Sequence, residues 1–172
     1  MTADTEQARI HKYGDHIDTD VIVPGKYLNV RDPAELARYC LEGLDPEFSA
    51  RVRPGDIIVA GRNFGCGSSR EHAAMALKAT GISCIVAESY ARIFYRNALN
   101  IGLPVLVCPD FVRAAQGGGV ATVDPMAGRL EYGGRQFRTP ALPAYVQSIV
   151  RAGGMVPFIR SRLAEEAIGR KS

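Results

Sequence analysis

The densest group of chemically useful residues lies in one stretch, residues 61–73, with the sequence GRNFGCGSSREHA. We expect a strand to end before it, its glycines to form a tight loop, and a helix to open at Ser68, Ser69 and Arg70. The unpaired amide groups and positive dipole end of a helix N-terminus favour anions. The planar guanidinium of Arg70 suits a carboxylate. The stretch therefore predicts a carboxylate-binding site.

A structural interpretation of the same residues stays open. Ser68 is followed three residues later by Glu71, which is the spacing of a capping box, and helix capping alone would explain both residues. Other glycine-rich motifs are excluded, because the loop has neither the Gly-Lys-Ser/Thr ending of a phosphate-binding loop nor a G-x-G-x-x-G pattern. No G-x-S-x-G element supports a serine hydrolase.

The elements that would position this stretch alternate between strand and helix, which predicts an α/β layered domain. Apolar runs predict buried strands at 55–60, 82–87 and 103–108, and Pro104 places the last of these at an edge or rim. Helices are predicted at 32–43, 68–81, 89–100 and 143–152, and short strands at 120–124, 129–132 and 136–138.

Length and composition indicate one globular domain. The chain has 172 residues, of which 47% are hydrophobic and 23% charged, close to ordinary globular usage. We expect a single domain over residues 1–163. The remaining residues, 164–172, are charged and poor in large apolar groups, so we expect a frayed tail there.

Charge and hydropathy exclude several classes of partner. The net charge of +3 comes from scattered Lys and Arg, not from the basic blocks that bind nucleic acid. No apolar run approaches the roughly 18 residues of a membrane span. Residues 1–14 lack the apolar core of a signal peptide, so we expect a cytoplasmic protein.

The cysteines do not form a metal-binding pattern. Cys40, Cys66, Cys84 and Cys108 stand far apart, without a C-x-x-C pair, and the chain has only three histidines. We therefore expect reduced thiols, and no metal or cofactor held by this chain.

Three segments resemble one family. Residues 63–73 (NFGCGSSREHA) resemble the signature of the aconitase and isopropylmalate isomerase swivelling-domain family. Residues 14–24 (GDHIDTDVIVP) resemble the family's opening, and residues 89–102 (SYARIFYRNALNIG) resemble its downstream helix. Together the resemblance covers most of residues 10–108, and three motifs in order are far more specific than one glycine loop.

The resemblance implies a three-layer β/β/α swivelling domain of the aconitase C-terminal type. Such a domain closes over a larger subunit, which carries a [4Fe–4S] cluster, and it is active only with that subunit. The implied activity is that of a hydro-lyase on a small dicarboxylic hydroxy acid, by dehydration and rehydration at the neighbouring carbon.

Particular residues take roles from the resemblance. Ser68 matches the serine that acts as catalytic base in its alkoxide form, and Ser69 and Arg70 match residues that grip a substrate carboxylate. Asp20 matches an aspartate that pairs with a histidine of the larger subunit. From spacing alone, Asp20 is also compatible with a solvated or turn-capping carboxylate.

Substrate choice in the family is associated with the loop after Pro-x-x-Tyr-Leu, here Asn29, Val30 and Arg31. Homoaconitase-like members tend to carry an arginine directly after Tyr-Leu, whereas Asn29 and Val30 are uncharged, so an apolar substituent fits better. We expect isomerisation of 2-isopropylmalate to 3-isopropylmalate, in leucine biosynthesis. Alternatives are homoaconitate, methyl-substituted malates, or a non-catalytic carboxylate-binding module; Arg31 could still reach the pocket.

Four further residues have structural interpretations. We expect a packed His72 inside its helix and a loop-packing Cys66. Arg92 and Arg96 lie four apart on one helix face, which could place positive charge near an anionic pocket or face solvent. A solvated or interface face is favoured for both arginines.

Overall fold

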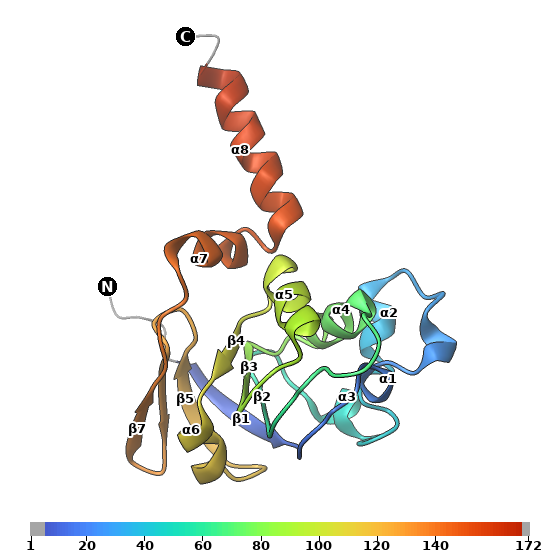
Figure 1. Ribbon diagram of the computed structural model, residues 1–172, viewed down its shortest axis with the longest axis vertical. Coiled ribbons are helices and arrows are strands. Elements are labelled where there is room, and N and C mark those ends of the chain that lie inside the picture. The colour runs from blue at the N-terminus through green and yellow to red at the C-terminus, as the bar shows by residue number, and fades with distance from the viewer. Residues whose placement is uncertain (1–5, 170–172) are drawn as a thin grey trace.

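The structure is a computed structural model that describes residues 6–169, and its centre is one seven-stranded sheet in the order β4-β3-β2-β1-β5-β6-β7 (Figure 1). The strands are β1 (Glu6–Lys12), β2 (Ile57–Ala60), β3 (Cys84–Ala87), β4 (Val105–Val107), β5 (Val120–Asp124), β6 (Arg129–Tyr132) and β7 (Arg135–Arg138). The sheet has a parallel half, β1 to β4, and an antiparallel half, β5 to β7, joined where β1 pairs with β5.

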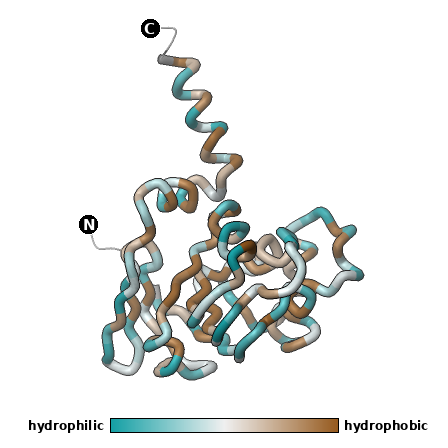
Figure 2. Tube along the Cα trace, viewed as in Figure 1, coloured by the Kyte–Doolittle hydropathy of each residue, from teal (hydrophilic) through white to brown (hydrophobic). Residues whose placement is uncertain are grey.

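The parallel half is buried on both faces. Alternate residues of each strand enter different cores, so that Ile58 and Ile85 face one and Ile57 and Cys84 the other. Figure 2 shows these central strands as mostly hydrophobic. The predicted buried strands are confirmed, and β4 forms the edge that Pro104 indicated.

The antiparallel half forms a second layer. Inward-facing residues of β5, β6 and β7, such as Val123, Leu130 and Phe137, share a core with one face of the parallel strands. Helix α6 (Pro109–Ala114) adds Phe111 and Val112 to this core.

Helices cover the opposite face of the parallel strands and form the third layer (Figure 1). They are α2 (Pro33–Ala37), α4 (Glu71–Ala79) and α5 (Arg92–Asn100). Leu36, Leu77 and Phe94 bury their side chains in this core. The three layers are the β/β/α arrangement that the family resemblance implies.

Helix α2 starts as predicted and ends early. The Asp32 side chain accepts a hydrogen bond from the Ala34 amide, and Pro33 occupies the first turn. The helix does not continue to residue 43, because Leu41 has a φ of 60° and donates its amide to the Ile22 carbonyl. A tertiary hydrogen bond thus replaces further helical turns.

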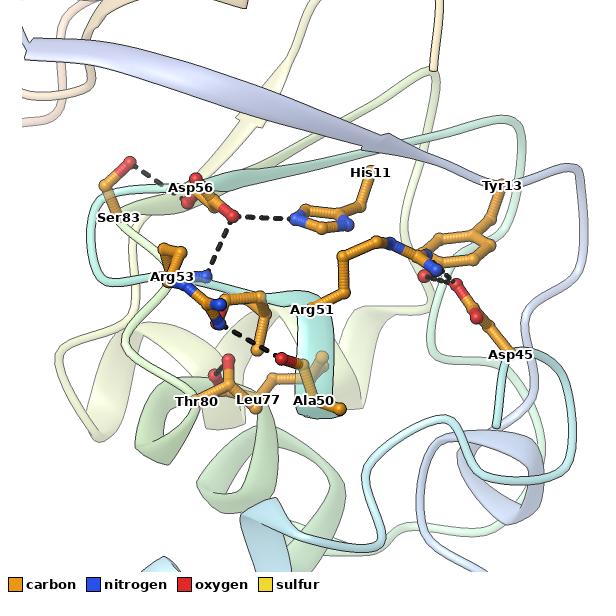
Figure 3. Close-up of polar contacts among 11 residues, drawn as sticks. His11, Tyr13, Asp45, Ala50, Arg51, Arg53, Asp56, Leu77, Thr80 and Ser83 are labelled. Carbon is orange, nitrogen blue, oxygen red and sulfur yellow. Dashed lines mark hydrogen bonds and ion pairs between the residues drawn. The ribbon is translucent and has the colours of Figure 1, made fainter. Parts of the chain in front are cut away.

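Four short helical segments escape sequence prediction, because each is shorter than the window of roughly 11–18 residues over which a helical period can be read. They are α1 (Thr19–Ile22), the 3-10 helix η1 (Gly25–Tyr27), α3 (Phe48–Arg51) and α6. A polar cluster ties α3 and the residues beside it to β1 (Figure 3). There the Tyr13 hydroxyl donates to Asp45 over 2.8 Å and Arg51 donates to the same carboxylate, while the buried His11 ring lies 2.8 Å from Asp56.

The C-terminal part consists of α7 (Ala144–Arg151) and α8 (Met155–Gly169). Helix α7 confirms the helix predicted at residues 143–152. Helix α8 projects away from the body (Figure 1) and continues to Gly169, through residues for which a frayed tail is predicted; residues 170–172 lie outside the described part. Alanine, leucine, glutamate and arginine are good helix formers, which explains a helix without a buried face. Within residues 6–169, no helix is long and apolar enough to cross a membrane.

Candidate functional site

The three segments that carry the family resemblance lie side by side. Residues 14–19 run along the loop 61–66 and are joined to it by backbone hydrogen bonds of 2.8–3.0 Å. The donor and acceptor pairs are Gly61 and Gly14, His16 and Arg62, Gly65 and Ile17, and Thr19 and Cys66. The opening segment therefore lies directly against the glycine loop and supports it.

The third segment joins the loop at Phe64. The Phe64 amide donates to the Ser89 carbonyl, and the Ala91 amide donates to the Phe64 carbonyl, each over 3.0 Å. The Ser89 hydroxyl also accepts from the Asn63 amide over 2.8 Å. Because residues 89–91 make these bonds in an extended conformation, α5 begins at Arg92 and not at the predicted Ser89.

Two glycines let these segments approach closely. Gly65 and Gly67 have φ values of 77° and 88°, which disfavour other residues. A Cβ atom at Gly65 would lie 2.1 Å from the Phe94 ring, and one at Gly67 would lie 2.3 Å from an Asp18 carboxylate oxygen. The loop can pass between α1 and α5 only with glycine at both positions.

Ser68 does not cap a helix. Helix α4 begins at Glu71, and its N-cap residue Arg70 is extended, with φ −118° and ψ 108° and no side-chain capping bond. The predicted helix start at Ser68 and the capping box with Glu71 are therefore wrong. The Ser68 carbonyl instead accepts a hydrogen bond of 2.8 Å from the hydroxyl of the buried Thr19, and this contact holds the chain away from helical geometry.

Ser68, Ser69 and Arg70 line a hollow of about 250 Å³ between the glycine loop and α5. Both serines are exposed. The other lining residues are Thr19, Gly65, Gly67, Ala91, Arg92, Ile93, Phe94 and Asn97. These described residues include hydroxyl, amide and guanidinium donors and no carboxylate. Their arrangement suits an anionic ligand of small size.

Arg70 and Asp20 are brought together as an ion pair across the edge of the hollow. The Arg70 side chain is 20% exposed and that of Asp20 52% exposed. A Cβ atom at Gly25 would lie 3.8 Å from the Arg70 guanidinium, so the arginine lies beside the start of η1. The predicted pairing of Asp20 with a histidine of another subunit stays a prediction.

Asn29, Val30 and Arg31 are not among the residues that line the hollow. Val30 is half-buried and packs against the helical core, whereas Asn29 and Arg31 are exposed. The preceding η1 is anchored, because Tyr27 stacks on Tyr39 with ring centroids 3.9 Å apart. The predicted substrate-binding role of the three residues stays a prediction.

Cys66 and His72 are both half-buried. Burial raises the pKa of the Cys66 thiol, and the Asp18 carboxylate raises this pKa further, so a reactive thiolate is not favoured at Cys66. No three His, Cys, Asp or Glu side chains come close enough to hold a metal ion anywhere in residues 6–169.

One residue of the site escapes sequence reasoning. Thr19 lies in the GDHIDTD segment, but only its buried hydroxyl contact with Ser68 reveals a role. Arg92 lines the hollow, the alternative that the sequence left open beside the favoured solvated or interface face, whereas Arg96 is not among the lining residues. The four-residue spacing places both arginines on one helix face and cannot show which of them lines the hollow. Both side chains are exposed.

A three-layer β/β/α domain with a serine pair and an arginine on a small hollow suited to an anion is the arrangement of the swivelling domain of aconitase-type enzymes. The model of the Aconitase C-terminal domain family matches residues 15–110, which include all three segments around the hollow apart from Gly14. The chain belongs to the Aconitase C-terminal domain family.

Relatives and solved structures agree with this assignment. The chain is 51% identical over 163 residues to the 3-isopropylmalate dehydratase small subunit of Caldicellulosiruptor saccharolyticus, covering 94% of both chains. It is 50% identical over 154 residues to the 2,3-dimethylmalate dehydratase small subunit of Eubacterium barkeri, covering 88% of this chain and 94% of the relative. The crystal structure of 3-isopropylmalate dehydratase from Methanocaldococcus jannaschii superposes with a TM-score of 0.88 at 39% identity, covering 95% of this chain and 98% of that one.

Proposed function

We propose that this chain is the small subunit of a 3-isopropylmalate dehydratase, a hydro-lyase that converts 2-isopropylmalate to 3-isopropylmalate in the cytoplasm during leucine biosynthesis. The observation that carries the proposal is the grouping of the exposed Ser68 and Ser69 with the half-buried Arg70 on a hollow whose described lining has no carboxylate. Relatives of that name at about half identity over nearly the whole chain support it.

Ser68 is the base of the proposed reaction. Its hydroxyl oxygen, as an alkoxide, takes the proton from the carbon beside a substrate carboxylate and returns a proton during rehydration. A serine hydroxyl is hardly ionised near neutral pH, so the protein has to stabilise the alkoxide form of Ser68. The Arg70 guanidinium lines the same hollow, and the described lining contains no carboxylate. Both features favour the alkoxide form of Ser68 over its neutral hydroxyl.

Ser69 and Arg70 hold a substrate carboxylate in the proposal. A guanidinium and a hydroxyl can donate to both carboxylate oxygens and fix the position of the adjacent carbon relative to Ser68. The Asp20 carboxylate occupies Arg70 in the single chain. When the larger subunit docks, Asp20 is proposed to turn to a histidine of that subunit, which frees the guanidinium for substrate.

The larger subunit is proposed to carry a [4Fe–4S] cluster, as the family resemblance implies. Within residues 6–169 of this chain, no three His, Cys, Asp or Glu side chains come close enough to hold a metal ion. Of its four free cysteines, Cys40, Cys84 and Cys108 are buried. The cluster, when bound, supplies a Lewis acid for the departing hydroxyl group. The role of this chain is therefore to position the substrate and move its proton.

Reconstitution tests the proposal. The chain combined with a cluster-loaded large subunit should convert 3-isopropylmalate to the unsaturated diacid, followed by its ultraviolet absorbance. Ser68→Ala should lower kcat by about 100- to 10,000-fold, the usual contribution of a general base, without loss of association on size exclusion. Ser161→Ala, on the exposed face of α8, is the control and should keep full activity. A Ser68→Ala enzyme within tenfold of the parent would refute the role of Ser68 as the base, and an inactive reconstituted parent would leave only the carboxylate-binding module.

A 2,3-dimethylmalate dehydratase subunit is the second candidate, favoured by the relative from Eubacterium barkeri at 50% identity. Both substrates are dicarboxylic hydroxy acids with apolar substituents, which fits the uncharged Asn29 and Val30 equally. The ratio of kcat/KM for 3-isopropylmalate and 2,3-dimethylmalate decides between them. We expect a ratio above ten for isopropylmalate; a ratio below one would reassign the substrate.

A further inference from the structure

The hollow beside Ser68 has a second wall, formed by the first turn of α5. Arg92 and Ile93 line the hollow together with Ser68 and Arg70. Arg92 is exposed and forms no ion pair with any residue of the range 6–169, whereas Arg70 is paired with Asp20. The site therefore contains a second guanidinium that is free to meet an anion.

This wall is held rigidly against the loop that carries Ser68. The buried Phe94 packs against Phe64 with ring centroids 5.2 Å apart, and it fills the space over Gly65. The backbone bond from Ala91 to the Phe64 carbonyl fixes the residue that caps α5. The first turn of α5 cannot shift without disturbing the loop, so Arg92 and Ile93 have defined positions at the hollow.

An exposed aliphatic side chain beside the guanidinium gives the wall a mixed character. Ile93 is 54% exposed, although the residue after it is buried in the core. Covering such a side chain is favourable by roughly 25 cal/mol per Å² of apolar area removed from water, so an alkyl group in the hollow would be stabilised there. The guanidinium beside it would at the same time hold a negative charge.

The chemistry of this wall matches the half of the substrate that Ser69 and Arg70 leave unbound. The proposed substrate has two carboxylates and a branched alkyl group, and a carboxylate buried without a cationic partner is costly. We infer that Arg92 binds the second carboxylate and that Ile93 contacts the alkyl substituent and contributes to substrate choice. This inference rests on the proposed function.

Arginine substitutions in the reconstituted enzyme test the first part. Arg92→Gln should raise KM for 3-isopropylmalate at least tenfold while kcat stays within about threefold, because the carboxylate contact is made equally in the ground and transition states. Arg92→Lys keeps the charge and should restore part of the affinity. Arg96→Gln, one turn further along α5 and outside the hollow, should change KM less than twofold.

Substitution of Ile93 tests the second part. Ile93→Thr should lower the preference for 3-isopropylmalate over 3-methylmalate about tenfold, since a few methylene contacts in an apolar site are worth that much discrimination. Ile159→Thr removes a similarly exposed isoleucine from α8 and should leave the preference unchanged.

The outcomes separate this inference from the proposed function. An active parent enzyme with an unchanged KM in Arg92→Gln overturns the role of Arg92, as does loss of association with the large subunit, which would make Arg92 an interface residue. An unchanged preference in Ile93→Thr overturns the role of Ile93. An inactive parent enzyme overturns the proposed function and the inference with it.

Discussion

Replacing Gly65 by alanine tests whether the loop and α5 are in direct contact, as the site requires. The backbone of Gly65 has a φ of 77°, and a Cβ atom there would lie 2.1 Å from the Phe94 ring. Two costs follow. A non-glycine residue in the left-handed region costs about 1–2 kcal/mol, and overpacking of a core side chain costs about 1–3 kcal/mol more.

The sum predicts a loss of about 2–5 kcal/mol in the free energy of unfolding. For a domain of this size each kcal/mol lowers Tm by about 2–4 °C, so Gly65→Ala should lower Tm by about 4–20 °C. Gly118 is a matched control, with a φ of 79° and no atom within 4 Å of a Cβ position. Gly118→Ala should incur only the backbone cost, about 1–2 kcal/mol.

Thermal unfolding followed by circular dichroism gives both Tm values. A Gly65→Ala variant that melts within 2 °C of Gly118→Ala would refute the contact with Phe94. A double variant adds a direct check, because Phe94→Leu makes room for the new methyl group. Combined with Gly65→Ala it should destabilise the protein by less than the sum of the single changes.

Two further predictions concern titrating groups. Burial raises the pKa of the Asp45 carboxyl, but hydrogen bonds from Tyr13 and Arg51 outweigh burial and hold this pKa below its ordinary value. The stabilisation is therefore present above the ordinary pKa and lost as pH falls through the folded one. Asp45→Asn should cost about 1–2 kcal/mol at pH 7 and much less at pH 3, measured by denaturant titration; an equal loss at both would contradict it. Burial raises the pKa of the Cys84 thiol to about 12, so a thiol reagent at pH 8 should label the half-buried Cys66 first by mass spectrometry, and equal labelling would contradict the buried position of Cys84.

The parts of the fold that sequence patterns predict are those marked by apolar runs or by turn residues. Apolar β-branched runs locate β2, β3 and β4, and turn residues locate β5, β6 and β7. Strand β1 escapes prediction, although the buried Ala8 and Ile10 alternate with the exposed Gln7 and Arg9. The alternation of apolar and polar residues in β1 is visible in the sequence, but it includes only two apolar residues. The pairing of β1 with β2 and β5 therefore decides its structure.

The site is predictable in composition and less so in geometry. The spacing of Ser68, Ser69 and Arg70 predicts an anion site, and the structure places all three on one hollow. Which other side chains join them depends on how α5 packs, because Arg92 and Arg96 are equivalent in sequence and differ only in their place on the helix. Contacts between segments, such as that of Thr19 with Ser68, have no signal in spacing.

The late start of α4 connects the local structure of the loop to its chemistry. A serine that caps a helix accepts a hydrogen bond from an amide of the first turn, which engages a hydroxyl lone pair that a base needs. Because α4 begins at Glu71, Ser68 stands before the helix with an exposed side chain. Its carbonyl would then lack a helical partner, and the Thr19 hydroxyl supplies one from the opening segment. The close packing of three distant segments therefore keeps Ser68 outside the helix, which leaves its hydroxyl available for the proton transfer proposed for it.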